Sequence, residues 1–212
     1  MNVWRASERV GQAVDLRAQI IDTAIAILTD VGYSRFSALR VARELQISQS
    51  HLTHYFPTRS DLLAEMATAI SERYVQRVER WCQEAREDQQ SNLGPFIDFA
   101  IDDAVSEPTR TLFPALWEAA NDHESMAEAL NQIYYQSQAS FLRMMDIDPN
   151  HPASSELWAL VRLLAAIIEG ATAIYGRGGT DYPQVKELKK TAKQMLIPRF
   201  NEAIVAYHKA KE

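Results

Sequence analysis

Apolar residues recur at steps of three and four along most of this chain, and this spacing constrains its fold more than any other feature. Over residues 16–31 they form one stripe, made of Leu16, Ile20, Ala24, Ile27, Leu28 and Val31. Such a stripe predicts an amphipathic helix, which Gly32 can end with a left-handed cap. The sequence contains no alternating run typical of strands and no internal repeat. We therefore predict an all-α protein of about nine helices.

Short helices with polar caps are expected after the first stripe. Ser37 and Ser48 stand at N-cap positions before two short helices, the second covering about residues 49–56. Pro57 cannot continue that helix, and Thr58 and Asp61 have the spacing of a cap for a long helix that ends near residue 86. Helical patterns continue beyond it, with breaks expected at 92–95, 108, 121–123, 148–152 and 177–183. The last two helices are expected at about 153–176 and 184–209.

The short helix at 49–56 has two different sides. Leu52, Tyr55 and Phe56 share one side of a helical wheel, and the polar residues Gln49, Ser50, His51, Thr53 and His54 lie on or beside the other. Two short helices joined by a tight turn, with donors and acceptors on the second, are typical of a helix-turn-helix, whose second helix enters the major groove of DNA. A short amphipathic surface helix would have the same periodicity and remains an alternative. Two histidines alone supply too few ligands for a metal site.

The charge of the chain is divided unevenly along its length. The total is −6, but residues 1–65 carry seven arginines and seven acidic residues, so the whole excess of acid lies in the remainder. Residues 33–60 carry four arginines and one acid, Glu44. A DNA-binding protein needs positive charge on the contacting face rather than in total. The arginines fit such a face, and an ordinary solvated surface remains the alternative.

A family resemblance rests on residues 17–63. The matching positions are Gly32-Tyr33, Ser37, Val41-Ala42, Leu45, Ile47-Ser48, Leu52, Tyr55-Phe56, Arg59 and Leu62-Leu63. In order and spacing they resemble the N-terminal DNA-binding domain of the tetracycline-repressor (TetR) family of transcriptional regulators. The resemblance implies a three-helix DNA-binding domain over residues 1–60 and a helical ligand-binding and dimerisation domain over 61–212. It implies that 49–55 is the recognition helix, with DNA-facing residues Gln49, Ser50, His51, Thr53 and His54. It also places Ser37, Arg40, Tyr55 and Arg59 where the family contacts phosphates or neighbouring bases.

Three positions depart from the family pattern. Gln46 stands where the family usually has Gly in the turn, so a left-handed backbone there would cost on the order of 1 kcal/mol. Thr53 replaces a usual Tyr, which removes an aromatic contact to the DNA backbone. His51 is larger than the small residue often found there, so the base preference of a relative does not transfer to this chain.

A small-molecule site is expected among the aromatic residues of the C-terminal part. Aromatic side chains at helical spacing more often fill a core, but they also line apolar pockets between helices. The candidate pocket residues are Phe96, Phe99, Phe113, Trp117, Asn121, Tyr134, Phe141 and Tyr175. A polar corner over residues 118–124 either faces a cationic or hydrogen-bonding ligand or lies in solvent.

The resemblance implies that the last two helices pair with those of a second copy. The candidate interface residues are Leu160, Leu164, Ile167, Ile168 and Ala171, and packing within one chain is the alternative. A two-fold dimer would carry two recognition helices to successive turns of the major groove on a pseudo-palindrome.

Other classes of protein fit the sequence less well. Cys82 is the only cysteine, no secretory signal precedes the first helix, and Arg162 and Glu169 interrupt the most apolar segment, so we expect a cytoplasmic protein that does not span a membrane. No catalytic or phosphate-binding motif occurs, and neither an enzyme nor a cofactor or metal is expected. The sequence thus predicts a homodimeric transcriptional regulator, a repressor released from its operator by a small molecule. A protein-interaction module and a small-molecule carrier or enzyme are the alternatives.

Overall fold

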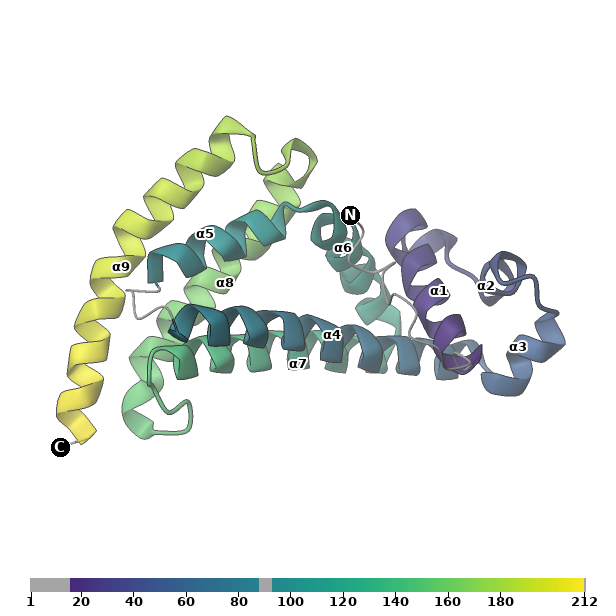
Figure 1. The fold of residues 1–212 in the computed structure, drawn as a ribbon, viewed down its shortest axis with the longest axis horizontal. Helices are drawn as coiled ribbons and strands as arrows, with labels where there is room; N and C mark the ends of the chain where they lie inside the picture. The colour runs from purple at the N-terminus through teal and green to yellow at the C-terminus, as the bar shows by residue number, and fades with distance from the viewer. Residues whose placement is uncertain (1–15, 88–92, 212) are drawn as a thin grey trace. The chain divides into compact units, whose positions relative to one another are not determined.

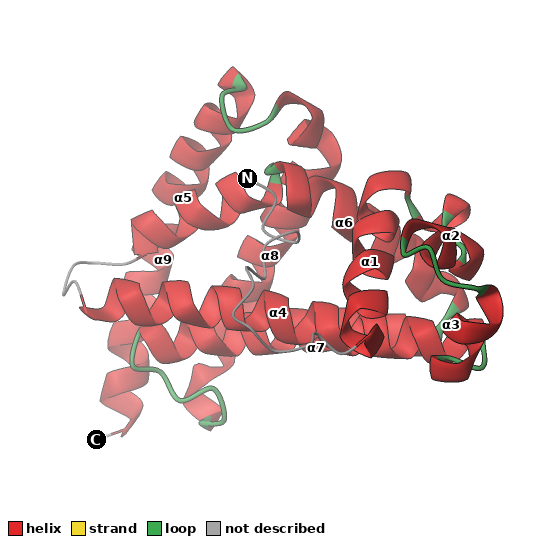
Figure 2. Cartoon of the chain, turned by 45° about the vertical axis from the view of Figure 1, so that its right-hand side comes forward, coloured by secondary structure: helices red, strands yellow, loops and turns green. Residues whose placement is uncertain are grey.

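The computed structural model describes residues 16–87 and 93–211, which contain helices and connecting loops and no strand (Figures 1 and 2). These described residues form nine α-helices: α1 Leu16–Val31, α2 Ala38–Glu44, α3 Gln49–Tyr55, α4 Arg59–Glu87, α5 Leu93–Ala104, α6 Glu107–Asp122, α7 Glu124–Met144, α8 Ser155–Tyr175 and α9 Pro183–Lys211. Three short 3-10 turns join them: η1 Tyr33–Arg35, η2 Pro152–Ser154 and η3 Gly176–Gly178. The predicted all-α class is confirmed. Residues 1–15 of the predicted DNA-binding domain lie outside the described residues.

Helix boundaries with a strong local signal agree with the prediction. Ser37 and Ser48 are the N-caps of α2 and α3, and each side chain accepts a hydrogen bond from the backbone N–H three residues later. The Thr58 hydroxyl accepts from the Asp61 N–H at 3.1 Å while the Asp61 carboxylate accepts from the Thr58 N–H at 2.9 Å. The break expected at 92–95 is wrong in part, because α5 begins at Leu93 and contains Pro95 in its first turn, where a missing N–H costs no helical hydrogen bond.

The chain divides into two compact units. Unit 1 contains residues 1–73 and 111–132, and unit 2 contains residues 74–110 and 133–212. Helices α4, α6 and α7 each continue from one unit into the other. The boundary expected at residue 60 falls inside unit 1, at the start of α4.

In unit 1, the buried stripe of α1 packs with α2, and α2 packs with α3. Ile20, Ala24, Ile25 and Leu28 supply the stripe, and Leu52 is the one residue of α3 that is buried. Because α3 has two turns and a single fully buried side chain, it is held mainly by its caps and by its neighbours rather than by its own helical stability.

Two helices of the chain end in the same capping motif, without the usual glycine. After α2, the Ile47 N–H donates to the Ala42 carbonyl and the Gln46 N–H donates to the Arg43 carbonyl. This is the Schellman pattern, and Gln46 has φ 56°, in the left-handed region. The left-handed turn expected at Gln46 is thereby confirmed. The end of α7 repeats the pattern with Asp146 at φ 59°.

The core of unit 2 is aromatic and aliphatic. Phe96 of α5 stacks on Phe141 of α7 with ring centroids 3.9 Å apart, and Phe200 of α9 meets Phe141 edge-on. Cys82 lies in this core with 5% of its surface exposed, and burial raises the pKa of its thiol to about 12. Ion pairs from Lys189 to Asp102 and from Lys193 to Asp98, both at 2.7 Å, join α9 to α5 at the edge of the core.

Helix α8 is the most apolar segment that the structure describes. By length and composition alone the stretch Pro152–Gly178 is long and apolar enough to cross a membrane, with a mean hydropathy of 1.8 in its most apolar window. The charged residues Arg162 and Glu169 lower the mean hydropathy but do not break the helix. In the structure α8 packs against α5 and α9 as a core helix of unit 2, although only 28% of its most apolar window is buried.

Candidate nucleic-acid interface

Helix α3 presents a continuous polar face to solvent. Gln49, Ser50, His51, Thr53 and His54 are all exposed, whereas Leu52 is 2% exposed and points into unit 1. The structure therefore brings together, on one side of two helical turns, the five residues predicted to face DNA. Each has the donors or acceptors that read base edges in a major groove.

Several of these side chains are already oriented by neighbours. The Thr53 hydroxyl donates to the Gln49 carbonyl at 2.8 Å, a bond to the preceding helical turn that fixes the hydroxyl. Ser50 lies 2.9 Å from the capping hydroxyl of Ser48. The rings of His51 and His54 both lie next to the Tyr55 ring, with centroids 5.8 and 5.6 Å away. The half-buried Tyr55 thus connects the exposed histidines to the core side of the helix.

The residues predicted to contact phosphates flank α3 in unit 1. Ser37 and Arg40 are exposed at the start of α2, and the Arg40 guanidinium donates to the Arg35 carbonyl at 3.3 Å. Arg59 is exposed at the first position of α4 and lies over the ring of Tyr33, 5.1 Å from its centroid. Contact with an aromatic face restricts the motion of the guanidinium. The N–H groups, which lie in the plane of the guanidinium, remain available to a phosphate.

One contact of this region could not be found from the sequence. The Tyr33 hydroxyl is hydrogen-bonded to His123 Nε2 at 2.6 Å, across 90 residues of chain. Burial raises the pKa of Tyr33, so its hydroxyl stays protonated at neutral pH. Because Arg59 stacks on the same ring, the corner between α6 and α7 is connected through two side chains to a predicted phosphate-binding residue. The other polar residues of this corner, Glu118, Asn121, Asp122 and Glu124, are exposed.

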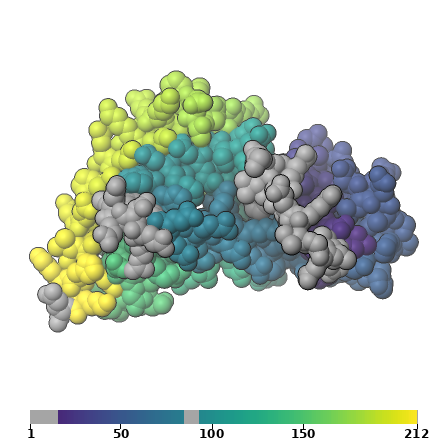
Figure 3. All heavy atoms as spheres, viewed as in Figure 1, coloured from purple at the N-terminus to yellow at the C-terminus, as the bar shows by residue number. Residues whose placement is uncertain are grey.

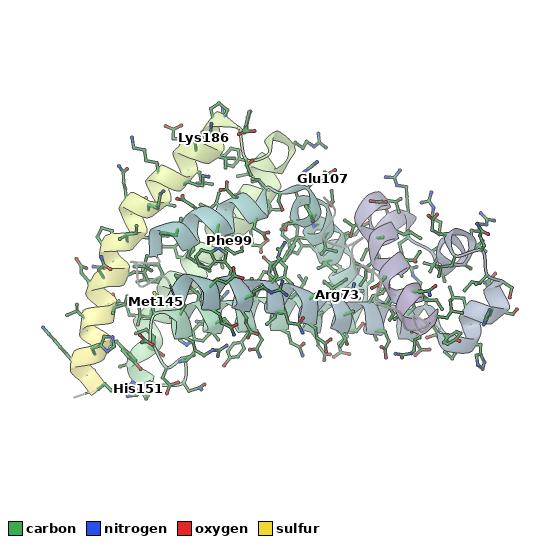
Figure 4. The ribbon with its side chains drawn as sticks, in the orientation of Figure 1. Arg73, Phe99, Glu107, Met145, His151 and Lys186 are labelled. Atoms are coloured by element: carbon green, nitrogen blue, oxygen red, sulfur yellow. The ribbon has the colours of Figure 1, made fainter. Side chains whose placement is uncertain are left out.

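The residues predicted to form a ligand pocket are divided between the two units. Phe113, Trp117 and Asn121 belong to unit 1, where Phe113 is buried and Asn121 is exposed. The other five belong to unit 2, where Phe96 and Phe141 stack on each other in the core. Phe99, Tyr134 and Tyr175 are half-buried. The side chain of Phe99 lies between α5 and α4 (Figure 4), stacked on Trp81 at 4.8 Å.

Two of the residues predicted to form a dimer interface are buried, and the other three are partly buried. Leu164 and Ala171 are each 1% exposed within the core of unit 2, and Leu160, Ile167 and Ile168 pack against that core. The exposed apolar residues of α8 are instead Leu163 and Ile174, at 50% and 71%. Met195 and Val205 are exposed on α9, which forms a continuous strip of surface (yellow in Figure 3).

Metal ligands do not gather anywhere in the described part of the chain: no group of three or more His, Cys, Asp or Glu side chains is placed to hold an ion. His51 and His54, the pair considered from the sequence, lie on an exposed face and pack against Tyr55.

Comparison with known proteins agrees with this geometry. Residues 20–66 match the family model described as "Bacterial regulatory proteins, tetR family". The HTH-type transcriptional regulator BetI of Burkholderia ambifaria is 28% identical over 127 residues, which cover 59% of this chain and 64% of that relative. BetI of Burkholderia cenocepacia is 25% identical over 159 residues, covering 72% and 81%. The chain thus spans less than two thirds of the first of these relatives.

Solved structures resemble the chain over most of its length. A TetR transcription regulator from Haloarcula marismortui has a TM-score of 0.60 at 18% identity, with 88% of this chain and 98% of that chain covered. GusR of Salmonella enterica has a TM-score of 0.62 at 15% identity, with 92% and 100% covered. At these identities the likeness concerns the fold.

The helix-turn-helix of α2 and α3, with the exposed polar face of α3, forms a candidate DNA-binding surface. The N-terminal segment is thus similar to the tetR family of bacterial regulatory proteins, and the chain shares the fold of solved TetR regulators. Its named relatives are transcription regulators rather than enzymes.

Proposed function

We propose that this protein is a cytoplasmic homodimeric repressor that binds a pseudo-palindromic operator through α3 and is released from it by a small molecule. The observation that carries the proposal is the face of α3, where five polar side chains are exposed on a short helix anchored by Leu52. A helix whose only task was to cover a core would not need this array of base-reading groups.

Two groups of residues contact the operator, one at the base edges and the other at the phosphates. Gln49, Thr53 and His54 read base edges, while Ser37, Arg40 and Arg59 hold phosphates and set the register of α3 in the groove. Phosphate contacts supply most of the salt-dependent affinity, and base contacts supply the discrimination between sequences.

Dimerisation would use the outward face of α8 and α9. Leu163, Ile174 and Met195 are large apolar side chains left in solvent by the folded chain, and α8 is mostly unburied despite its high hydropathy. Exposed apolar surface of this kind marks an interaction site. A two-fold operation on this face yields an isologous interface and two copies of α3, which fits a palindromic operator.

Release by a small molecule follows from linkage. The ligand lowers operator affinity only to the extent that it binds better to the conformation that does not fit the operator. The Tyr33–His123 hydrogen bond supports this role, because it connects the α6–α7 corner of unit 1 to the ring on which Arg59 rests.

The test is selection of bound duplexes from a random DNA library at near-physiological salt. We expect enrichment of a two-fold-symmetric site, with half-sites about 34–36 Å apart or a multiple of that distance. His54→Ala should relax the selected sequence, while His208→Ala, an exposed histidine on α9, should leave it unchanged. Absence of any enriched site would refute the proposal and favour a protein-interaction module built on the same helix.

The dimer is tested separately by sedimentation. Leu163→Glu and Ile174→Glu should give monomers, because each places a charge in the proposed interface. Thr68→Glu adds the same charge at an exposed position of α4 and should leave the dimer intact. A wild-type protein that sediments as a monomer at micromolar concentration would contradict the two-fold reading of the operator.

A further inference from the structure

Unit 2 contains a group of polar side chains inside its helices, and two buried atoms of this group, Arg77 Nε and Glu169 Oε2, have no hydrogen-bond partner among the described residues. We propose that the Glu169 carboxylate is the anchor of the small-molecule site and that the effector is a protonated amine carrying an apolar body. The inference rests on the proposed function, because it names the ligand class for the release step.

The neighbouring charges compensate one another. Arg77 of α4 is paired with Asp103 of α5 at 2.6 Å, and the Asp103 carboxylate also accepts from Thr109 at 3.2 Å and from Tyr74 at 3.4 Å. This carboxylate is therefore neutralised and well supplied with donors. The Asp103 carboxylate therefore needs no further donor or cation from a ligand.

Glu169 of α8 differs in both respects. Tyr134 of α7 donates a hydrogen bond to its carboxylate, yet the other oxygen, Oε2, is buried and receives no donor from the described part of the chain. No cation of the described residues forms an ion pair with it. Because the Arg77–Asp103 pair is neutral, an ionised Glu169 leaves one uncompensated negative charge in this region of unit 2.

The pKa of the Glu169 carboxyl is consistent with its burial and with the absence of a paired cation. Burial raises the pKa of its carboxyl from 4.5 to about 7, and the Tyr134 hydrogen bond offsets only part of that effect. Tyr74, also buried, has its pKa raised first by burial and further by the charges of Asp103 and Glu169, so Glu169 is close enough to α4 for the two groups to interact. An ammonium N–H placed at Oε2 would stabilise the ionised carboxylate and lower its pKa.

Aromatic surface continues from the polar group along the same helix faces. Tyr74, Arg77 and Trp81 follow one another at three- and four-residue steps on α4, and Phe99 precedes Asp103 by one turn on α5. The ring centroids of Trp81 and Phe99 are 4.8 Å apart and both side chains are only partly buried, so they offer apolar faces on the helices that carry the charged cluster. An apolar body attached to the amine fits these rings, whereas an anionic ligand would meet the uncompensated carboxylate.

Straight-chain amines and alcohols provide matched probes. Butylamine, hexylamine and octylamine have the same apolar chains as butanol, hexanol and octanol but carry a protonated nitrogen at pH 7. We expect at least one amine to bind the full-length protein about tenfold or more tightly than the alcohol of equal length in titration calorimetry, the factor that corresponds to one charge-assisted hydrogen bond. Amine binding at pH 7 should also release protons, seen as a different apparent heat in phosphate and in Tris.

Variants assign the preference to Glu169. Glu169→Gln keeps the shape and should reduce the amine-to-alcohol ratio to about one, while Glu187→Gln, the same change at an exposed position of α9, should leave it unchanged. Tyr134→Phe removes the hydroxyl that fixes the carboxylate and should lower the ratio only in part. Equal binding of amines and alcohols, failure of every amine to bind, or an undiminished ratio in Glu169→Gln would each overturn the inference.

The outcome is separable from that of the proposed function. Selection of an operator together with failure of the amines leaves the DNA-binding proposal intact and removes the ligand assignment. Amine binding that depends on Glu169, without any selected operator, supports the ligand assignment and refutes the DNA-binding proposal. When both succeed, the bound amine should weaken operator binding by wild-type protein and have no effect on the Glu169→Gln variant.

Discussion

Replacing Gln46 by glycine should stabilise the helix-turn-helix. Gln46 occupies the left-handed position of a Schellman motif with φ 56°, a conformation that costs a side-chain-bearing residue about 1–2 kcal/mol. Glycine adopts it freely but loses about 0.5–1 kcal/mol more backbone entropy on folding. The net expected gain is therefore about 0.5–1 kcal/mol, or about 1–4 °C in Tm for a chain of this size.

The assay is native-state hydrogen exchange of the Gln46 and Ile47 amides, whose hydrogen bonds close the turn. Slower exchange is expected in Gln46→Gly and not in Gln46→Ala, which removes the same side chain but keeps the strained backbone. Asp146→Gly, at the matching turn after α7, should gain less, because Asp tolerates the left-handed region better than Gln. Equal protection in the Gly and Ala variants at 46 would refute the reasoning from backbone strain.

Three further expectations concern the interface and the interior. His54→Ala should lose about 1–3 kcal/mol of discrimination between operator and mismatched DNA. Arg59→Ala should instead weaken binding to all sequences and reduce the slope of log affinity against log salt concentration by about one. Equal effects of both variants on specific and non-specific binding would contradict the assignment of His54 to base edges and of Arg59 to phosphates. A double-mutant cycle of Tyr33→Phe and His123→Ala should show a coupling of about 1 kcal/mol in the free energy of unfolding, and strict additivity would rule the 2.6 Å bond out as a stabilising contact. Because the folded-state pKa of Glu169 lies above its unfolded value, wild type should lose stability relative to Glu169→Gln as pH rises from about 4.5 through about 7, by about 3 kcal/mol in total. The measurement is the free energy of unfolding of both proteins by urea at pH 4.5 and pH 8. The same difference between the two proteins at both pH values would rule out a pH-dependent cost of the buried carboxyl.

The sequence predicts best those features that depend on neighbours in the chain. The caps at Ser37 and Ser48 and the bounds of α1 follow from local hydrogen bonding and periodicity, and the structure has them at the expected residues. The two sides of α3 are equally local, because seven residues on a helix fix which side chains point together.

The features that could not be predicted depend on which face meets which neighbour. Helix α8 is apolar on nearly every side, so its pattern does not say whether Leu163 or Leu164 points inward, although the two differ by 100° around the axis. The Tyr33–His123 bond joins residues 90 positions apart, and a corner of charged residues gives no sign of its partner. From the sequence, Glu169 is only a charge that interrupts an apolar segment, because the missing donor at its Oε2 is a property of packing.

The buried thiol of Cys82 gives this protein a practical advantage. With a pKa of about 12, on the order of one molecule in 10⁵ carries the reactive thiolate at pH 7, and the side chain is covered by the core of unit 2. Because the sequence contains no second cysteine, a new cysteine at an exposed site beside α3 would be the only group to react with a maleimide dye. In the proposed dimer, energy transfer between two such dyes would then report the separation of the two copies of α3 directly, with and without the proposed effector, and without mutating the native cysteine.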